Sequence, residues 1–148
     1  MIYRIACVGR IKEQHFTQML NEYKKEIDKR GRLEICEVPD ERIPQKAGDK
    51  VNAMIIEAEA DRLRHVIGRD DYVIALCIEG KKTTTEGLAD QVRRASVNFY
   101  IGYDESLTAD MENFSLCSVQ PSAEMTALLL SEQTYRAYTI LNNITYHK

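Results

Sequence analysis

Residues 72–78 read YVIALCI, the most apolar run in the chain. Apolar residues follow one another there instead of alternating with polar ones, and the acidic pair Asp70-Asp71 and Gly80 mark turns on either side. A short continuous apolar run between turn signals is typical of a strand that is covered on both faces. The segment therefore predicts a central strand of an α/β sheet.

The sequence on both sides of this run alternates between strand and helix patterns. Short apolar runs predict further strands at residues 2–8, 33–38, 97–101 and 114–119. Apolar residues at helical spacing predict helices over residues 16–27, 51–63 and 123–142, and another helix through Leu88 and Val92. Such alternation indicates a mostly parallel sheet of five to six strands with helices on both faces. The expected fold class is α/β, in a single domain spanning residues 1–148.

Local signals refine the element ends and indicate where a ligand would bind. Thr83, three residues before Glu86, fits a capping box, and Gly31 is expected to end the first helix. Ligands of parallel sheets bind beyond the carboxyl ends of the strands. We therefore expect functional residues in the loops after Ile78, Ile101 and Cys117.

Composition narrows the class of protein. Of the 148 residues, 44% are apolar and 29% charged, which is ordinary for a globular domain and unlike a disordered chain. The sequence has no leader pattern and no apolar run long enough to span a bilayer, so we expect a cytoplasmic protein. Four widely spaced cysteines fall in predicted strands, which favours buried thiols over a zinc site.

The charged residues favour local rather than general contacts with nucleic acid. The net charge of −3 provides no overall attraction for phosphate. Local basic groups occur at Lys24, Lys25, Lys29, Arg30 and Arg32, at Lys81 and Lys82, at Arg93 and Arg94, and at the C-terminus. None of the common nucleotide, hydrolase or metal motifs is present, and no metal is expected. Of three histidines, only His147, between Tyr146 and Lys148, suggests chemistry.

Several segments, in order along nearly the whole chain, resemble one enzyme family. They are Ala6-Cys7-Val8-Gly9 with Lys12-Glu13, residues 37–41 (EVPDE), Leu76 with Gly80-Lys81, residues 86–89 (EGLA), Ile101-Gly102, residues 132–137 (EQTYRA) and the end Tyr146-His147-Lys148. This order and spacing is similar to that of the large-subunit (23S) ribosomal RNA pseudouridine N3-methyltransferases, which belong to the SPOUT superfamily.

The resemblance implies a C-terminal trefoil knot, a homodimer, S-adenosylmethionine as cofactor and large-subunit ribosomal RNA as partner. Carried over position by position, it implies a cofactor pocket formed by Leu76, Gly102, Leu116, Cys117, Ser118, Val119, Gln120 and Pro121. It implies that Tyr146, His147 and Arg136 are catalytic. N3 of a pseudouridine must lose its proton before it attacks a methyl group. In this hypothesis His147 accepts the proton and Arg136 or Lys148 stabilises the anion.

The chain departs from the family pattern close to the implied cofactor pocket. Tyr103 stands where the family has the second of two glycines, and Ser122 follows Pro121 in place of a histidine. No basic residue occurs between Pro121 and Arg136. An alternative is therefore a catalytically weakened or inactive paralogue that keeps the knotted dimeric fold as an RNA- or ribosome-binding module. An unrelated α/β nucleotide-binding module is a third, weaker hypothesis.

Overall fold

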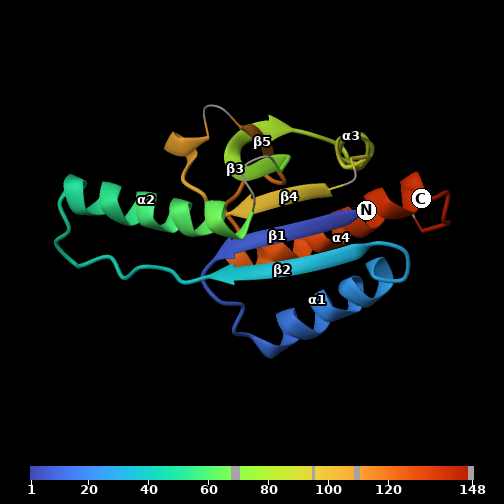
Figure 1. Cartoon of the computed structure of the whole chain (residues 1–148), viewed down its shortest axis with the longest axis horizontal. Helices are drawn as coiled ribbons and strands as arrows, with labels where there is room; N and C mark the ends of the chain where they lie inside the picture. The colour runs from blue at the N-terminus through green and yellow to red at the C-terminus, as the bar shows by residue number, and fades with distance from the viewer. Residues whose placement is uncertain (68–70, 95, 109–110, 147–148) are drawn as a thin grey trace.

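The part of the chain that the computed structural model describes, residues 1–67, 71–94, 96–108 and 111–146, folds as five parallel strands and four α-helices (Figure 1). In chain order they are β1 (Ile2–Val8), α1 (Gln14–Ile27), β2 (Arg32–Val38), α2 (Asp49–Val66), β3 (Val73–Lys82), α3 (Thr85–Gln91), β4 (Ser96–Ile101), the short 3-10 helix η1 (Glu105–Leu107), β5 (Glu112–Ser115) and α4 (Ala123–Leu141). The expected α/β class and the parallel sheet are confirmed.

The strands are ordered β2-β1-β4-β3-β5 across the sheet. Ile5 of β1 pairs with Ile35 of β2 on one side and with Phe99 of β4 on the other. The apolar run that predicted a central strand lies in β3, between β4 and β5. Because all the pairs are parallel, the carboxyl ends of the strands point toward one end of the molecule, which is where ligands of such sheets bind.

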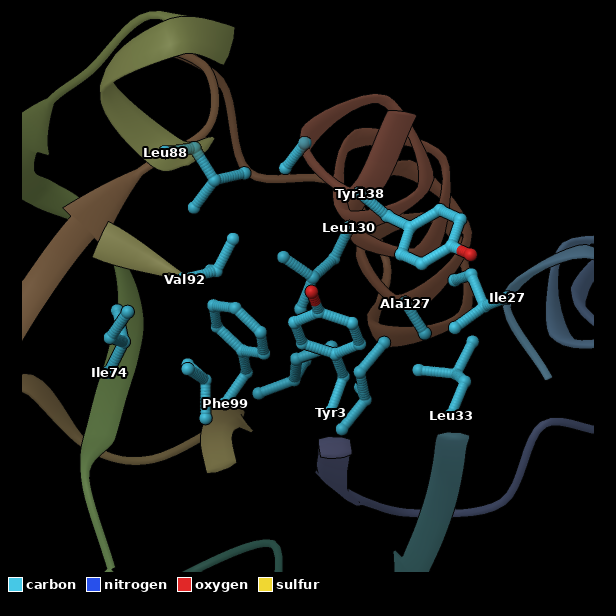
Figure 2. Close-up of a cluster of buried hydrophobic side chains, with 14 of the residues drawn as sticks. Tyr3, Ile27, Leu33, Ile74, Leu88, Val92, Phe99, Ala127, Leu130 and Tyr138 are labelled. Carbon is cyan, nitrogen blue, oxygen red and sulfur yellow. The ribbon is translucent and has the colours of Figure 1, made fainter. Parts of the chain in front are cut away.

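The larger core lies between one face of the sheet and helices α1, α3 and α4 (Figure 2). Tyr3 and Phe99 point from their strands toward Leu130 and Tyr138 of α4, and Tyr3 and Phe99 have no exposed surface. Alternate residues of a strand point to opposite faces, which is why Tyr3, Ile5 and Cys7 share this core while Ala6 does not. This packing fixes α4 beside the strands that lead to the candidate site.

The opposite face of the sheet is covered by α2, so the expectation of helices on both faces is confirmed. Ala60, Leu63 and Ile67 pack against Ala6 and Tyr100 in a smaller core. The amino-terminal half of α2 extends past the carboxyl ends of β1 and β2 (left in Figure 1). The chain therefore buries less apolar surface on this face than on the face that carries α4.

Two strand boundaries differ from the sequence prediction. The strand expected at residues 72–78 continues to Lys82, where Lys81 pairs with Phe114 after an irregularity that follows Leu76. Gly80 makes this possible, because a Cβ at that position would lie 2.6 Å from the carbonyl carbon of Phe114. The strand expected at 114–119 ends at Ser115, and residues 116–122 connect β5 to α4. That connection supplies much of the candidate site.

Helix ends also differ from the expected caps. Thr84, not Thr83, caps α3 by accepting a 3.1 Å hydrogen bond from the Gly87 backbone N–H, so the predicted pairing of Thr83 with Glu86 is wrong by one residue. The first helix ends at Ile27 with Asp28 as its C-cap, three residues earlier than Gly31. Ser122 caps α4, and its hydroxyl accepts a 3.2 Å hydrogen bond from the Met125 N–H. The residue that replaces the family's histidine thus starts the helix.

Cys7, Cys36 and Cys77 lie in strands as expected, whereas Cys117 lies after β5, and none of the four forms a disulfide. Only Cys7 is fully buried, and burial raises the pKa of its thiol to about 11. No helix within the described ranges is both long and apolar enough to cross a membrane.

Candidate functional site

A pocket lies between the second half of β3, the connection after β5 and the first turn of α4. We call it the strand-end pocket, and it has an empty volume of about 310 Å³. Its walls are formed by Leu76, Cys77, Ile78, Leu116, Cys117, Val119, Gln120, Pro121 and Thr126. The pocket thus lies at the end of the apolar run of β3 and beside the connection that follows the carboxyl end of β5, near the edge where ligands of parallel sheets bind.

Six of the eight residues that the family resemblance implies for a cofactor pocket lie in this wall. They are Leu76, Leu116, Cys117, Val119, Gln120 and Pro121. Ser118 belongs to the same connection but is exposed and lies outside the wall. Gly102 is also outside the wall, one residue after Ile101, which pairs with Leu76. The structure therefore brings most of the predicted set together from two separate parts of the chain.

Three wall residues were missed by the sequence prediction: Cys77, Ile78 and Thr126. The continuation of the apolar run past Leu76 could have indicated Cys77 and Ile78. Thr126 had no such signal, because it lies in a helix whose pattern indicated only core residues. Its hydroxyl donates to the Ser122 carbonyl at 2.8 Å, which ties it to the first turn of α4.

Local hydrogen bonds hold the connection between β5 and α4 in shape. The Ser115 hydroxyl donates to the Cys117 carbonyl at 2.9 Å, and the Cys117 thiol contacts the Val119 carbonyl at 3.1 Å. The connection thus presents a bend of backbone and small side chains to the pocket. A wall of apolar side chains with a few polar groups fits a flat ring that carries polar edges, such as the adenine of S-adenosylmethionine.

Tyr103 does not enter the strand-end pocket, although it follows Gly102. Gly102 has a φ of +79°, a left-handed conformation that favours glycine, and it turns the chain toward the α2 face. The Tyr103 ring stacks on Tyr100 with centroids 5.0 Å apart and is 4% exposed. The bulky residue at the family's second glycine position is therefore accommodated in the smaller core.

The C-terminal residues form a second cluster near the end of α4. Arg136 donates from Nε to Glu132 Oε1, and this hydrogen bond is the main cause that raises the pKa of the Arg136 guanidinium, which stays charged. The Arg136 Cζ lies 5.5 Å from the centre of the Tyr146 ring, and Tyr146 packs edge-on against Tyr135 at 4.7 Å. His147 and Lys148, which were predicted to act beside them, lie outside the described residues.

The C-terminal cluster and the strand-end pocket are separated along α4. Thr126 belongs to the pocket wall, and Arg136 follows ten residues later, a distance of about 15 Å at the helical rise. The structure thus brings Arg136 and Tyr146 together but does not place them in the pocket wall. Within the described ranges, no group of histidine, cysteine, aspartate and glutamate side chains has the arrangement of a metal site.

The whole chain is similar to known methyltransferases. The family model described as "Predicted SPOUT methyltransferase" matches residues 1–147. A ribosomal RNA large subunit methyltransferase H from Oenococcus oeni is 36% identical over 98% of this chain and 98% of its own length. The protein of the same name from Heliobacterium modesticaldum is also 36% identical, again over 98% of both chains. A putative methyltransferase H from Methanococcus maripaludis is 33% identical over 97% of this chain and 98% of its own.

Proposed function

Since the chain belongs to the SPOUT methyltransferase family, we propose that it transfers a methyl group from S-adenosylmethionine to N3 of a pseudouridine in large-subunit (23S) ribosomal RNA. The relatives of similar length are named as large-subunit ribosomal RNA methyltransferases, which supports this substrate. The single observation that carries the proposal is the strand-end pocket, whose wall contains six of the eight residues implied for the cofactor.

The strand-end pocket suits the donor because of its walls. Leu76, Leu116 and Pro121 provide apolar surface, while Gln120 and the Thr126 hydroxyl provide polar groups at its edge. When bound, S-adenosylmethionine supplies a methyl group that its sulfonium has already activated. The protein then mainly has to hold the donor in one orientation and exclude water. The bend after β5, with its internal hydrogen bonds, is built for that positioning role.

The C-terminal cluster suits the acceptor side of the reaction. N3 of pseudouridine is an imide nitrogen that becomes nucleophilic when it loses its proton, and a fixed positive charge stabilises the anion. Arg136 is held in place by Glu132 and lies against the Tyr146 ring. We propose that Arg136 stabilises the anion, that Tyr146 positions the guanidinium, and that His147 accepts the proton.

We further propose that the protein acts as a cytoplasmic homodimer and that its C-terminal part forms the trefoil knot of the family. Large apolar side chains remain exposed in this chain at Met19, Val119 and Met125, on α1, in the connection after β5 and in the first turn of α4. A second copy could cover them. Light scattering coupled to gel filtration tests the dimer, and a monomer at micromolar concentration would contradict it.

The direct test of the donor site is calorimetric titration with S-adenosylhomocysteine, followed by transfer of labelled methyl groups to large ribosomal subunits that lack the modification. Cys117→Trp should fill the pocket and abolish both binding and transfer, because Cys117 lies in its wall. The control is Gln45→Trp, which places the same side chain at an exposed position in the loop before α2. A folded wild-type protein without any binding of the cofactor product would favour the inactive, RNA-binding alternative.

A further inference from the structure

A second pocket adjoins the strand-end pocket. We call it the polar pocket. Its empty volume is about 890 Å³, and its walls are Thr83, Thr84, Thr85, Glu86, Leu88, Ser115, Leu116, Leu129 and Gln133. Six of these nine residues carry a hydroxyl, a carboxylate or an amide. Leu116 belongs to the walls of both pockets, so they are direct neighbours on either side of the start of the connection after β5.

The polar pocket lies between the donor site and the C-terminal cluster along α4. Thr126 lines the strand-end pocket, Leu129 and Gln133 line the polar pocket, and Arg136 belongs to the cluster. Leu129, Gln133 and Arg136 follow Thr126 by three, seven and ten residues. This spacing places all four residues on one side of the helix. Gln133 is about 10 Å along the axis from Thr126 and about 5 Å from Arg136. A group in the polar pocket would therefore lie between the methyl donor and the guanidinium.

Hydrogen bonds connect the polar pocket to Arg136. The Thr85 hydroxyl donates to Gln133 Oε1 at 2.8 Å, and Gln133 Nε2 donates to Glu132 Oε2 at 2.7 Å. The other oxygen of Glu132 accepts from Arg136 Nε. The orientation of the Gln133 amide is thus fixed from both ends, and a ligand that displaces or extends one of these bonds would be sensed at the arginine.

We propose that the polar pocket receives the acceptor nucleobase, a uracil-type base taken out of its stack. The edge of such a base alternates carbonyl acceptors with N–H donors, and hydroxyls such as that of Thr85 can both donate and accept. Leu88, Leu116 and Leu129 offer apolar surface for the faces of the ring. Proteins that act on or read a base in RNA bind it in this splayed form. The assignment rests on the proposed function.

The surroundings of the pocket fit an RNA strand. Lys81 and Lys82, at the end of β3, immediately precede the threonines of the wall, and both lysines are exposed. Lysines beside a base-binding pocket can contact the phosphates that flank a splayed nucleotide. The chain has a net charge of −3, so its surface as a whole does not attract RNA. The phosphate backbone of the RNA would have to be attracted locally, by Lys81 and Lys82.

The experiment measures donor binding and acceptor turnover separately in Thr85→Val and Gln133→Ala. Because each variant loses a hydrogen bond to the base, kcat/KM for large ribosomal subunits at saturating S-adenosylmethionine should fall by about fivefold to a hundredfold. The Kd of S-adenosylhomocysteine should stay within about twofold of wild type. Thr85→Ser keeps the hydroxyl and should restore most of the turnover. Gln45→Ala, on the exposed loop before α2, is the matched control for the glutamine change.

Each other outcome contradicts the assignment in a different way. Unchanged acceptor kinetics in both variants would mean that no base occupies the polar pocket. If the variants also bind S-adenosylhomocysteine more weakly, the polar pocket belongs to the donor site. Thermal melting separates misfolding from a lost contact, and Gln133→Glu, which keeps the side-chain length, replaces any variant that melts early. A wild-type protein that transfers no methyl group would instead defeat the proposed function, and the polar pocket's role with it.

Discussion

The hydroxyl of Tyr103 accepts two hydrogen bonds from the guanidinium of Arg64, at 3.0 Å from Nε and 2.6 Å from Nη2. Arg64 lies on α2, and its pKa is raised chiefly by a further hydrogen bond to Glu57. The strand-end pocket is on the other face of the sheet, where α4 packs. A tyrosine at the family's glycine position is therefore compatible with a donor site, because α2 provides a hydrogen-bond donor, Arg64, for the Tyr103 hydroxyl on the opposite face of the sheet.

Tyr103→Phe tests this interpretation. The change keeps the stacking on Tyr100 but removes the acceptor of two hydrogen bonds from a charged group. We expect the free energy of unfolding, measured in urea, to fall by about 1 kcal/mol, since Arg64 is partly exposed and water can replace the lost acceptor. The affinity for S-adenosylhomocysteine should not change. A weakened affinity with normal stability would place Tyr103 at the donor site instead.

The fold was largely predictable because its signals are local. The apolar run in β3 and the helical spacing in α1 and α4 depend on residues that are neighbours in sequence, and each element was found. The ends of β3 and β5 were not found, because they depend on a contact between distant segments. Gly80 allows the backbones of the two strands to approach, and a single sequence does not show which backbone a glycine will meet.

The candidate site was predictable only where a family motif marks it. Leu116, Cys117 and Pro121 came from the resemblance, and the structure places them in one wall with Leu76. The polar pocket was not predicted, because its threonines resembled a helix cap and Gln133 was noted only as part of the family motif at residues 132–137. Only the packing of α3 beside α4 brings these polar side chains together.

Buried tyrosines should make the protein sensitive to alkaline pH. Burial raises the pKa of Tyr3 and of Tyr100 to about 12 in each case. In the unfolded chain a tyrosine loses its proton near pH 10, so above that pH the folded state binds more protons than the unfolded state. The free energy of unfolding should therefore fall between about pH 10 and about pH 12, by up to about 3 kcal/mol per tyrosine. Urea unfolding in steps of pH measures this.

Tyr3→Phe should make that decline shallower, because it removes one of the buried phenols, while Tyr100 and the Cys7 thiol, whose pKa values are also raised, still contribute to it. The same variant loses the hydrogen bond from the Tyr3 hydroxyl to Met1 Sδ at 3.0 Å, so it should be slightly less stable at neutral pH. An unaltered pH dependence would show that Tyr3 is accessible to hydroxide in the folded state.

Tyr138→Phe should behave in the opposite way at neutral pH. The Tyr138 side chain is 3% exposed, and its hydroxyl has no hydrogen-bond partner among the described residues. Removing a buried polar group that has no partner removes its desolvation cost, so we expect the free energy of unfolding to rise by about 1 kcal/mol. Thr134→Val should stabilise the protein for the same reason. The Thr134 hydroxyl, one helical turn before Tyr138, is also buried and has no hydrogen-bond partner among the described residues. A loss of stability in both variants would reveal a partner for these hydroxyls in the assembled protein.

Thiol labelling can report on the strand-end pocket without any assay of RNA. Cys77 and Cys117 lie in its wall, whereas Cys7 is buried in the larger core and Cys36 packs against the smaller core on the α2 face. A maleimide reacts when a thiolate sulfur adds to its double bond, forming a carbon–sulfur bond while a proton is taken up at the adjacent carbon. Burial raises the thiol pKa of both Cys7 and Cys36, so these two should react slowly.

Saturating S-adenosylhomocysteine should protect only the two thiols in the pocket wall. At ten times its Kd, the fraction of open sites and hence the labelling rate of Cys117 should fall about tenfold, with Cys77 following, because only the free protein can react. Peptide mass spectrometry follows each cysteine, and the rate at Cys36 serves as the internal control. If calorimetry detects binding while the rate at Cys117 is unchanged, the donor binds elsewhere, because Cys117 is part of the wall of the strand-end pocket.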